Sequence, residues 1–235
     1  MKKYGLLLVF SVLALSCDRQ GEENTMVVEG RIKGLKKGTL YLQHIPDSSL
    51  VTLDSLQIRG DGAFRLQASV EEPDLFYLYL SKADNNILDD RISFFGEPGH
   101  YRIQTSWNAF EADAEIQGTQ VQENYEKYKE NKSRFNMQRL ELARALGTAA
   151  SAADTARVDS LQAALDQNLR RSYLYTLNFA LSNKGSYLAP FITYTEVADA
   201  NIKYLDSVYR ALPPQIASSK YGKKLKELIE ASPGE

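Results

Sequence analysis

The chain of 235 residues contains very little cysteine and histidine, with one Cys and two His. A single Cys cannot form a disulfide within the chain, and so few soft ligands argue against a zinc or iron–sulfur site. An excess of one charge is also lacking, because 28 Lys and Arg stand against 30 Asp and Glu and give a net charge of −2. This balance offers no electrostatic reason to bind nucleic acid. With 43% hydrophobic and 25% charged residues, the composition is that of an ordinary globular protein.

Long hydrophobic runs are lacking except near the N-terminus. Residues 6–15 form an apolar run about half as long as the ~20 residues that a membrane-spanning helix needs. Lys2 and Lys3 precede this run, and Ser16 and Cys17 follow it, an order typical of an export signal. The sequence therefore predicts a signal peptide over residues 1–16.

Residues 13–17, Leu-Ala-Leu-Ser-Cys, resemble the lipobox of bacterial lipoproteins. In that family the Cys is acylated and becomes the first residue of the mature protein, so the resemblance implies lipid attachment at Cys17. Ala14 departs from the lipobox pattern, which has Leu at this position, and residues 14–16 also fit an ordinary cleavage site that releases a secreted protein. The polar residues 17–25 read as a flexible tether. We therefore expect a lipid anchor in the cell envelope, at the outer membrane, on its periplasmic face or at the cell surface.

Apolar and polar residues alternate over residues 26–118, as is typical of half-buried strands. The segments 40–45, 64–70 and 101–104 alternate in this way, and turns containing Gly and Pro separate them. Residues 75–80 are apolar on both faces, as expected for a central strand. About eight short strands predict an antiparallel β-sandwich domain over residues 26–118.

The period changes to three or four residues in the second half, which predicts an α-helical region over residues 119–232. Two apolar stripes, separated by the small residues 147–154, predict two helices of roughly 25 residues that pair as an antiparallel hairpin. Shorter helices should follow, with Asp199 and either Ser218 or Ser219 as caps. The predicted fold class is therefore α+β, a β-sandwich followed by helices.

Short motifs along the sandwich region carry a likeness to a known family. They lie at residues 28–35, 38–42, 53–55, 60–64, 96–101 and 116–119. They resemble the N-terminal domain of unknown function in Gram-negative envelope lipoproteins of the thioredoxin-like thiol–disulfide oxidoreductase group. Residues 221–225 resemble the helical segment that precedes the thioredoxin domain in those proteins. Family members continue into that domain with its Cys-x-x-Cys pair, whereas this sequence ends at Glu235. Since dithiol exchange needs two sulfurs, the resemblance implies an envelope location and an accessory module, without redox activity.

His44 and His100 are the two imidazoles of the chain. They form a general base or a metal pair only where the fold brings them together, so structural roles are the simpler interpretation. Other catalytic spacings, such as Gly-x-Ser-x-Gly or Ser-x-x-Lys, are not found. We therefore expect no catalytic, cofactor-binding or metal-binding residues.

An acidic cluster and an adhesion-like tripeptide also have plain structural interpretations. Asp84, Asp89, Asp90 and Glu97 lack the ligand spacing of a calcium-binding EF-hand and fit a polar connection between strands. The tripeptide Arg-Gly-Asp at residues 59–61 supplies Gly and Asp where a hairpin turn needs them.

Tyrosine is abundant, with 14 residues in the chain. Its apolar ring and polar tip suit surfaces that bind ligands or partners. Six tyrosines are candidates to line a groove where the sandwich meets the helical hairpin: Tyr77, Tyr79, Tyr125, Tyr128, Tyr173 and Tyr175. Simple packing at the seam is the alternative interpretation.

The sequence as a whole predicts a lipid-anchored envelope protein without catalysis of its own. It is expected to bind another envelope protein or a small ligand through the junction of its two regions. Two alternatives stay open. In the first alternative, the chain is the recognition half of a split thiol–disulfide system that works with a separate thioredoxin-like protein. In the second, it is a surface lipoprotein that binds glycans or nutrients.

Overall fold

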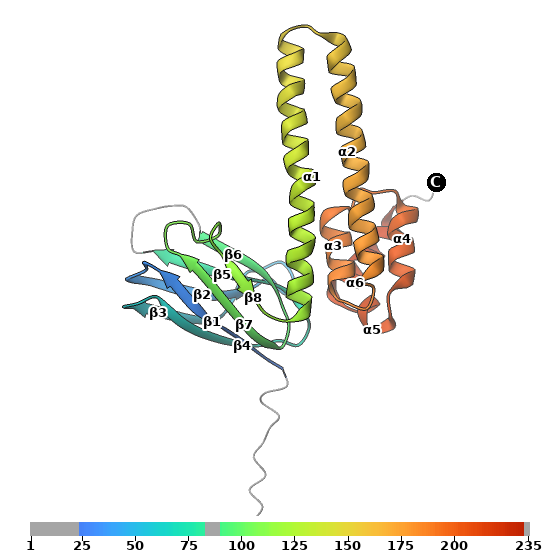
Figure 1. The fold of residues 1–235 in the computed structure, drawn as a ribbon. Helices are drawn as coiled ribbons and strands as arrows, with labels where there is room; N and C mark the ends of the chain where they lie inside the picture. Colours follow the sequence, from blue (N-terminus) through green and yellow to red (C-terminus); the bar gives the residue numbers. More distant parts are fainter. Residues whose placement is uncertain (1–23, 83–89, 233–235) are drawn as a thin grey trace, which may run out of the picture.

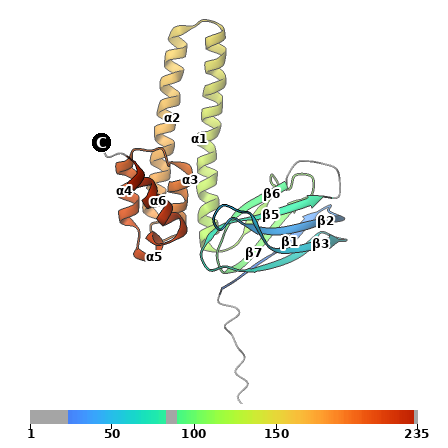
Figure 2. The ribbon, with the colours of Figure 1, turned by 180° about the vertical axis from the view of Figure 1, so that it is seen from behind.

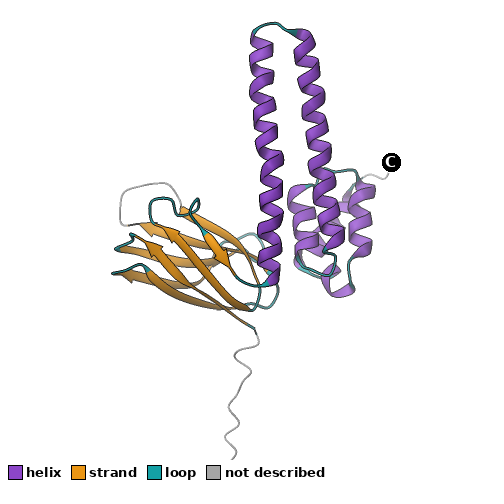
Figure 3. Cartoon of the chain, viewed as in Figure 1, coloured by secondary structure: helices purple, strands orange, loops and turns teal. Residues whose placement is uncertain are grey.

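The computed structural model describes residues 24–82 and 90–232 of the chain. Within these residues, eight strands come first along the chain and six helices follow. The strands and the helices occupy separate parts of the molecule (Figure 3). The predicted α+β class, a β-sandwich followed by helices, is confirmed. The predicted lipid-attachment residue Cys17 and the predicted signal peptide lie outside the described residues.

Two four-stranded sheets form the sandwich in the described part of the chain. Sheet A has the spatial order β4–β1–β7–β8, and sheet B has the order β3–β2–β5–β6. The strands are β1 (Thr25–Lys33), β2 (Lys37–His44), β3 (Val51–Arg59), β4 (Ala63–Ser69), β5 (Asp74–Lys82), β6 (Asp90–Gly96), β7 (Gly99–Ser106) and β8 (Glu115–Gln117). Neighbouring strands are antiparallel except β1 and β7, which run parallel. Alternation of apolar and polar residues assigns side chains to the two faces of a sheet but carries no information on strand direction. The sequence pattern therefore could not predict that β1 and β7 run parallel.

The alternating apolar residues fill the space between the two sheets. Val28, Leu40, Leu78 and Phe94, from four different strands, are inaccessible to solvent. Strand β5, predicted to be central, lies between β2 and β6. It is apolar on both faces because one face fills the sandwich and the other begins, at Leu75, to pack against the helices.

The turn between β3 and β4 carries the chain from sheet B to sheet A. Gly60 and Gly62 have φ angles of +124° and +78°, a region that side chains other than Gly rarely adopt. A Cβ atom on Gly62 would lie 2.1 Å from the carbonyl oxygen of Ile32. Asp61 pairs with Arg31 at 2.8 Å. The adhesion-like tripeptide is therefore part of a structural turn.

The helices that follow form a long hairpin with shorter helices beside its base (Figures 1 and 2). They are α1 (Gln120–Ser151), α2 (Thr155–Ser182), α3 (Leu188–Glu196), α4 (Ile202–Ala211), α5 (Pro214–Ala217) and α6 (Lys220–Ala231). At about 1.5 Å per residue, α1 and α2 are each roughly 40 to 50 Å long, and their far ends rise beyond the other helices. Within residues 24–82 and 90–232, none of the helices has the length and apolar composition that crossing a membrane requires.

The break between the long helices is shorter than predicted. Helix α1 continues through Gly147 to Ser151, since the Ala-rich residues around it favour helix and Gly147 has open space around its Cα. The chain reverses at Ala153, which has a φ of +55°, and the Asp154 side chain accepts a hydrogen bond from the first turn of α2. The reversal therefore needs three residues rather than eight.

One predicted helix cap is correct and one is wrong. Ser219 caps α6 by accepting a hydrogen bond from the Gly222 N–H at 3.2 Å. Asn201, and not Asp199, caps α4. Asp199 instead accepts a hydrogen bond from the Tyr173 hydroxyl at 2.6 Å, so its carboxylate joins the connection between α3 and α4 to α2.

Candidate functional site

An aromatic seam joins the two halves where α1 packs beside β6 (Figure 1) and where Phe191 of α3 reaches Phe95. Phe95 is fully buried there, and its ring centroid lies 6.0 Å from that of Tyr125 and 5.2 Å from that of Phe191. Phe191 also meets the ring of Tyr221 edge-on at 4.9 Å. The Phe95 backbone N–H donates to Oε1 of the buried Gln122 at 2.7 Å. The seam is thus packed, and the buried Gln122 amide pairs with the backbone of Phe95.

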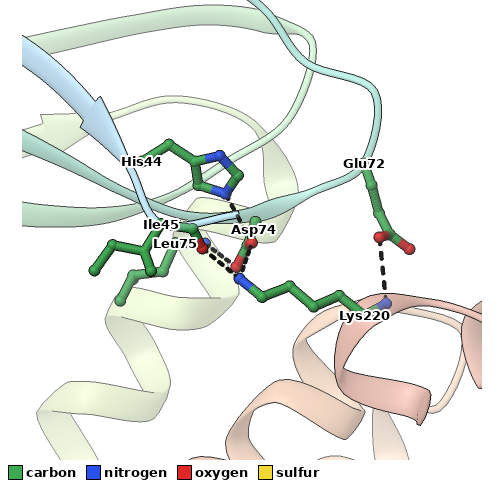
Figure 4. A network of polar contacts seen from close by, with 6 residues as sticks. All are labelled: His44, Ile45, Glu72, Asp74, Leu75 and Lys220. Carbon is green, nitrogen blue, oxygen red and sulfur yellow. Dashed lines mark hydrogen bonds and ion pairs between the residues drawn. The ribbon is translucent and has the colours of Figure 1, made fainter. Parts of the chain in front are cut away.

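A polar network joins the halves at the end of the sandwich (Figure 4). Lys220, the first residue of α6, donates through Nζ to Oδ2 of Asp74 and to the carbonyl oxygen of Ile45, both at 2.6 Å. Nε2 of His44 lies 2.8 Å from the same Asp74 oxygen. The His44 ring stacks on Phe76 with centroids 4.6 Å apart. One carboxylate therefore holds a lysine from the helices and a histidine from the sandwich.

Glu72 adds a second contact to the same helix end (Figure 4). Its Oε2 accepts a hydrogen bond from the backbone N–H of Lys220 at 3.3 Å. The first N–H groups of a helix have no partner within the helix, and the helix dipole favours a negative charge at this end. Glu72 thus satisfies one free donor and stabilises α6 where it meets the sandwich.

Asp74 is ionised in this setting. Burial raises the pKa of its carboxyl, but the hydrogen bonds from His44 and Lys220 outweigh this effect and lower the pKa below the ordinary value of 3.8. Its other oxygen, Oδ1, accepts the Leu75 backbone N–H at 2.7 Å. With three donors already bound, this carboxylate is suited to holding the two halves together rather than to accepting protons from a substrate.

A cleft of about 660 Å³ opens beside this network. Its lining includes both acidic and basic side chains, among them Glu71, Glu227, Lys223 and Lys224. His44 could act there as a base through Nδ1, because Asp74 engages Nε2 and orients the ring. The mixture of charges does not select a ligand of either sign.

Tyrosines gather beside the seam on the outer face of sheet B. We call the outward residues Tyr41, Gln43, Tyr77, Tyr79 and Arg91 the tyrosine face; the cross-strand register of β2, β5 and β6 places them side by side. The rings of Tyr41 and Tyr79 stack with centroids 5.9 Å apart. The guanidinium of Arg91 lies 5.5 Å from the ring of Tyr77 and 5.6 Å from that of Tyr79. The three tyrosines are half-buried, so part of each ring faces solvent.

The tyrosines on the helices next to this face stay neutral. Burial is the main cause that raises the pKa of Tyr125, and the Glu196 carboxylate raises it further. Burial also raises the pKa of Tyr221, to which the Asp74 carboxylate adds. These phenols therefore keep their protons at physiological pH and can donate hydrogen bonds.

The six tyrosines predicted to line one groove divide into two groups. Tyr125 packs in the seam and Tyr77 lies near it, whereas Tyr79 contacts Tyr41 and Arg91 on sheet B. Tyr128 is buried between α1 and α2, where its hydroxyl lies 3.0 Å from Oγ1 of Thr176 and its ring stacks on Tyr175. Tyr173 lies on α2, where its hydroxyl donates to Asp199 in the connection between α3 and α4. The division follows from helical geometry, since residues three apart on α1 point in directions that differ by about 60°.

The two histidines lie on different sheets. His44 ends β2 and lines the cleft beside α6, whereas His100 lies exposed on β7 and lines a cleft with Arg65 and Gln67. Asp84 and Asp89 of the acidic cluster lie outside the described residues. Where the structure describes the chain, no three His, Cys, Asp or Glu side chains are grouped so as to hold a metal ion.

Sequence reasoning missed Lys220 and Asp74. They are separated by 146 positions and belong to different halves. One feature of the sequence does indicate a role for Asp74: it is a carboxylate at the start of an otherwise apolar strand, and a buried carboxylate needs a partner. Nothing in the sequence identifies that partner.

Comparison with known protein families gives one match. Residues 26–125 match the family described as "Domain of unknown function (DUF4369)", which spans the sandwich and the first turn of α1. No curated protein and no solved structure matches the chain significantly.

Proposed function

We propose that this chain is a lipid-anchored protein of the bacterial cell envelope whose sandwich and helices form a non-catalytic binding module. The N-terminal sequence supports the anchor, because a short apolar run with Lys2 and Lys3 before it ends at Ser16-Cys17. The domain of unknown function at residues 26–125 coincides with the region that resembles the N-terminal part of thioredoxin-like envelope lipoproteins.

The tyrosine face is the observation that carries the binding role. Half-exposed aromatic rings next to a guanidinium supply large contact area and hydrogen-bonding groups together, as binding surfaces do. The network of Lys220, Asp74 and His44 and the aromatic seam hold α3 and α6 beside this face. The surface is therefore assembled before any partner arrives, which reduces the entropy lost on binding.

The anchor is tested by metabolic labelling with a fatty acid and by membrane fractionation. The native chain should carry the label and sediment with membranes, whereas Cys17→Ser should lose the label and become soluble in the envelope fraction. A native protein that carries no lipid and stays free of membranes would refute the anchor.

The binding surface is tested by photo-crosslinking in intact cells. A photoreactive residue placed at position 79 should give a defined adduct with an envelope component. The same residue at position 204 is the matched control, because Tyr204 is also an exposed tyrosine, 55% accessible, but lies on α4. Equal adducts at both positions, or none at position 79, would contradict the assignment.

A second candidate function follows from the resemblance to thioredoxin-like lipoproteins. In this case the chain is the recognition half of a thiol–disulfide system and presents substrates to a separate thioredoxin-like protein. Deleting the gene should then shift envelope proteins from their native disulfides toward reduced or mispaired forms, as measured by thiol alkylation. Unchanged disulfides would rule this role out.

A further inference from the structure

The tyrosine face has a regular layout set by strand register. Tyr41 pairs across the strands with Tyr79, and Tyr79 with Arg91. In the next row, Gln43 pairs with Tyr77. Neighbouring strands are about 4.8 Å apart and rows on one face about 7 Å apart, so the five side chains form one continuous surface.

Two polar atoms on this face lack a partner. Among the described residues, the buried side-chain atoms without a hydrogen bond are Oε1 of Gln43 and Nε of Arg91. Gln43 is 8% exposed, and its Nε2 donates to Thr52 at 3.4 Å, so only the acceptor end of the amide is unpaired. Buried polar groups almost always have partners, and exceptions call for an explanation. Both atoms are buried, so they lie beneath the tyrosine rings and do not contact a ligand that binds on the outside of the face.

The charge of the face is of one sign. Lys37 and Arg59, a direct cross-strand pair at one end of β2 and β3, continue the same side of sheet B beyond Tyr41, and with Arg91 they are the charged groups of this side. No described residue that points outward from sheet B is an Asp or Glu. A cleft of about 230 Å³ lined by Lys37, Thr39 and Gln57 extends the surface at this end. An anionic ligand therefore fits the face, although the chain as a whole has a net charge of −2.

We infer that the tyrosine face binds an acidic saccharide, a chain of sugar rings that carry carboxylates. This inference rests on the binding role proposed above and names its ligand class. The apolar C–H groups of sugar rings pack against the parts of the Tyr41 and Tyr79 rings that face solvent. The sugar carboxylates pair with the cationic groups of Lys37, Arg59 and Arg91. A flat face suits such a chain better than a peptide, which adds to a sheet edge or needs pockets for its side chains.

The test uses the full-length protein in detergent and isothermal titration calorimetry with two probes. Hexagalacturonate is the acidic probe and maltohexaose the neutral one. We expect the acidic hexamer to bind, the neutral one to bind at least about tenfold more weakly, and added salt to weaken binding of the acidic probe.

Variants on the face and away from it assign the site. Tyr79→Ala should weaken binding of the acidic probe about tenfold through the lost ring contact. The double variant Lys37→Gln with Arg59→Gln should weaken it by a similar factor and flatten the salt dependence. Both of these side chains are exposed, so the double variant should fold normally. Tyr204→Ala and Arg65→Gln, on α4 and on sheet A, are the controls and should bind as the native chain does.

The inference is overturned when the acidic hexamer does not bind, when maltohexaose binds equally well, or when the controls lose as much affinity as the face variants. Absence of saccharide binding together with a protein adduct at position 79 would reject the saccharide and leave the binding module standing. Absence of both would reject the two proposals together.

Discussion

Lys220→Met tests whether the polar network holds the two halves together. The substitution keeps an apolar stem of similar length but removes the hydrogen bonds from Nζ to Asp74 and to Ile45, both 2.6 Å long. Hydrogen bonds to charged groups contribute about 1.5–3 kcal/mol each. Asp74 keeps His44 and Leu75 as donors, and the Lys220 side chain is 18% exposed, so the loss is reduced by partial solvation. We expect the free energy of unfolding to fall by about 2–4 kcal/mol.

Urea unfolding with two probes measures this loss. Trp107 is the one tryptophan of the chain and follows β7, so its fluorescence reports the sandwich. Far-ultraviolet circular dichroism reports mainly the helices. Both transitions should move, because the network joins the two halves.

Lys226→Met is the matched control for this experiment. Lys226 lies on the same helix, but its side chain is 53% exposed and its ion pair with Glu230 is 3.6 Å long. The control should change stability by less than about 0.5 kcal/mol. A loss below that value for Lys220→Met, an equal loss in the control, or a shift of only one probe would refute the reasoning.

Further predictions concern the same network, the seam and two glycines. Because the folded-state pKa of Asp74 is lowered, its contribution is present above about pH 4 and fades as the pH falls through the folded-state value. The stability difference between the native chain and Asp74→Asn, measured by urea unfolding, should therefore shrink in acid; a constant difference would contradict this. Phe95→Ala should lower the free energy of unfolding by about 3–5 kcal/mol, because it empties the centre of the seam; a loss below about 1 kcal/mol would argue against its burial there. Gly62→Ala should cost more than about 2 kcal/mol through its positive φ and the contact with the Ile32 carbonyl. Gly147→Ala should increase the free energy of unfolding by about 0.5–1 kcal/mol and so raise the melting temperature, because no atom lies within 4 Å of the added Cβ. Equal effects of the two glycine substitutions on stability would refute both explanations.

Local pattern was a good guide to the elements. Alternation over residues 64–70 and the doubly apolar run 75–80 correspond to β4 and the central strand β5. The change of period near Thr119 marks the start of α1, and Ser219 caps α6. These features depend on a few adjacent residues, whose side-chain directions are fixed by the geometry of a strand or a helix.

The candidate site was predicted only in part. Tyrosine abundance pointed to the junction, and Tyr125 and Tyr77 do come together there, whereas Tyr79 stays on the open part of sheet B. The same reasoning misplaced Tyr128 and Tyr173, because their directions depend on which side of each helix faces the sandwich. His44 drew attention for its residue type, but its partner Asp74 did not.

The sequence by itself determined the order of strands and helices along the chain, since periodicity and turn residues act over short distances. Tertiary structure alone decided that β1 runs parallel to β7 and that Lys220 meets Asp74. It also gathered Tyr41, Arg91 and their neighbours on one carboxylate-free face of the described sheet. The physical reason is that contacts between distant segments are selected by the packing of whole surfaces, and no local pattern records which surfaces will meet.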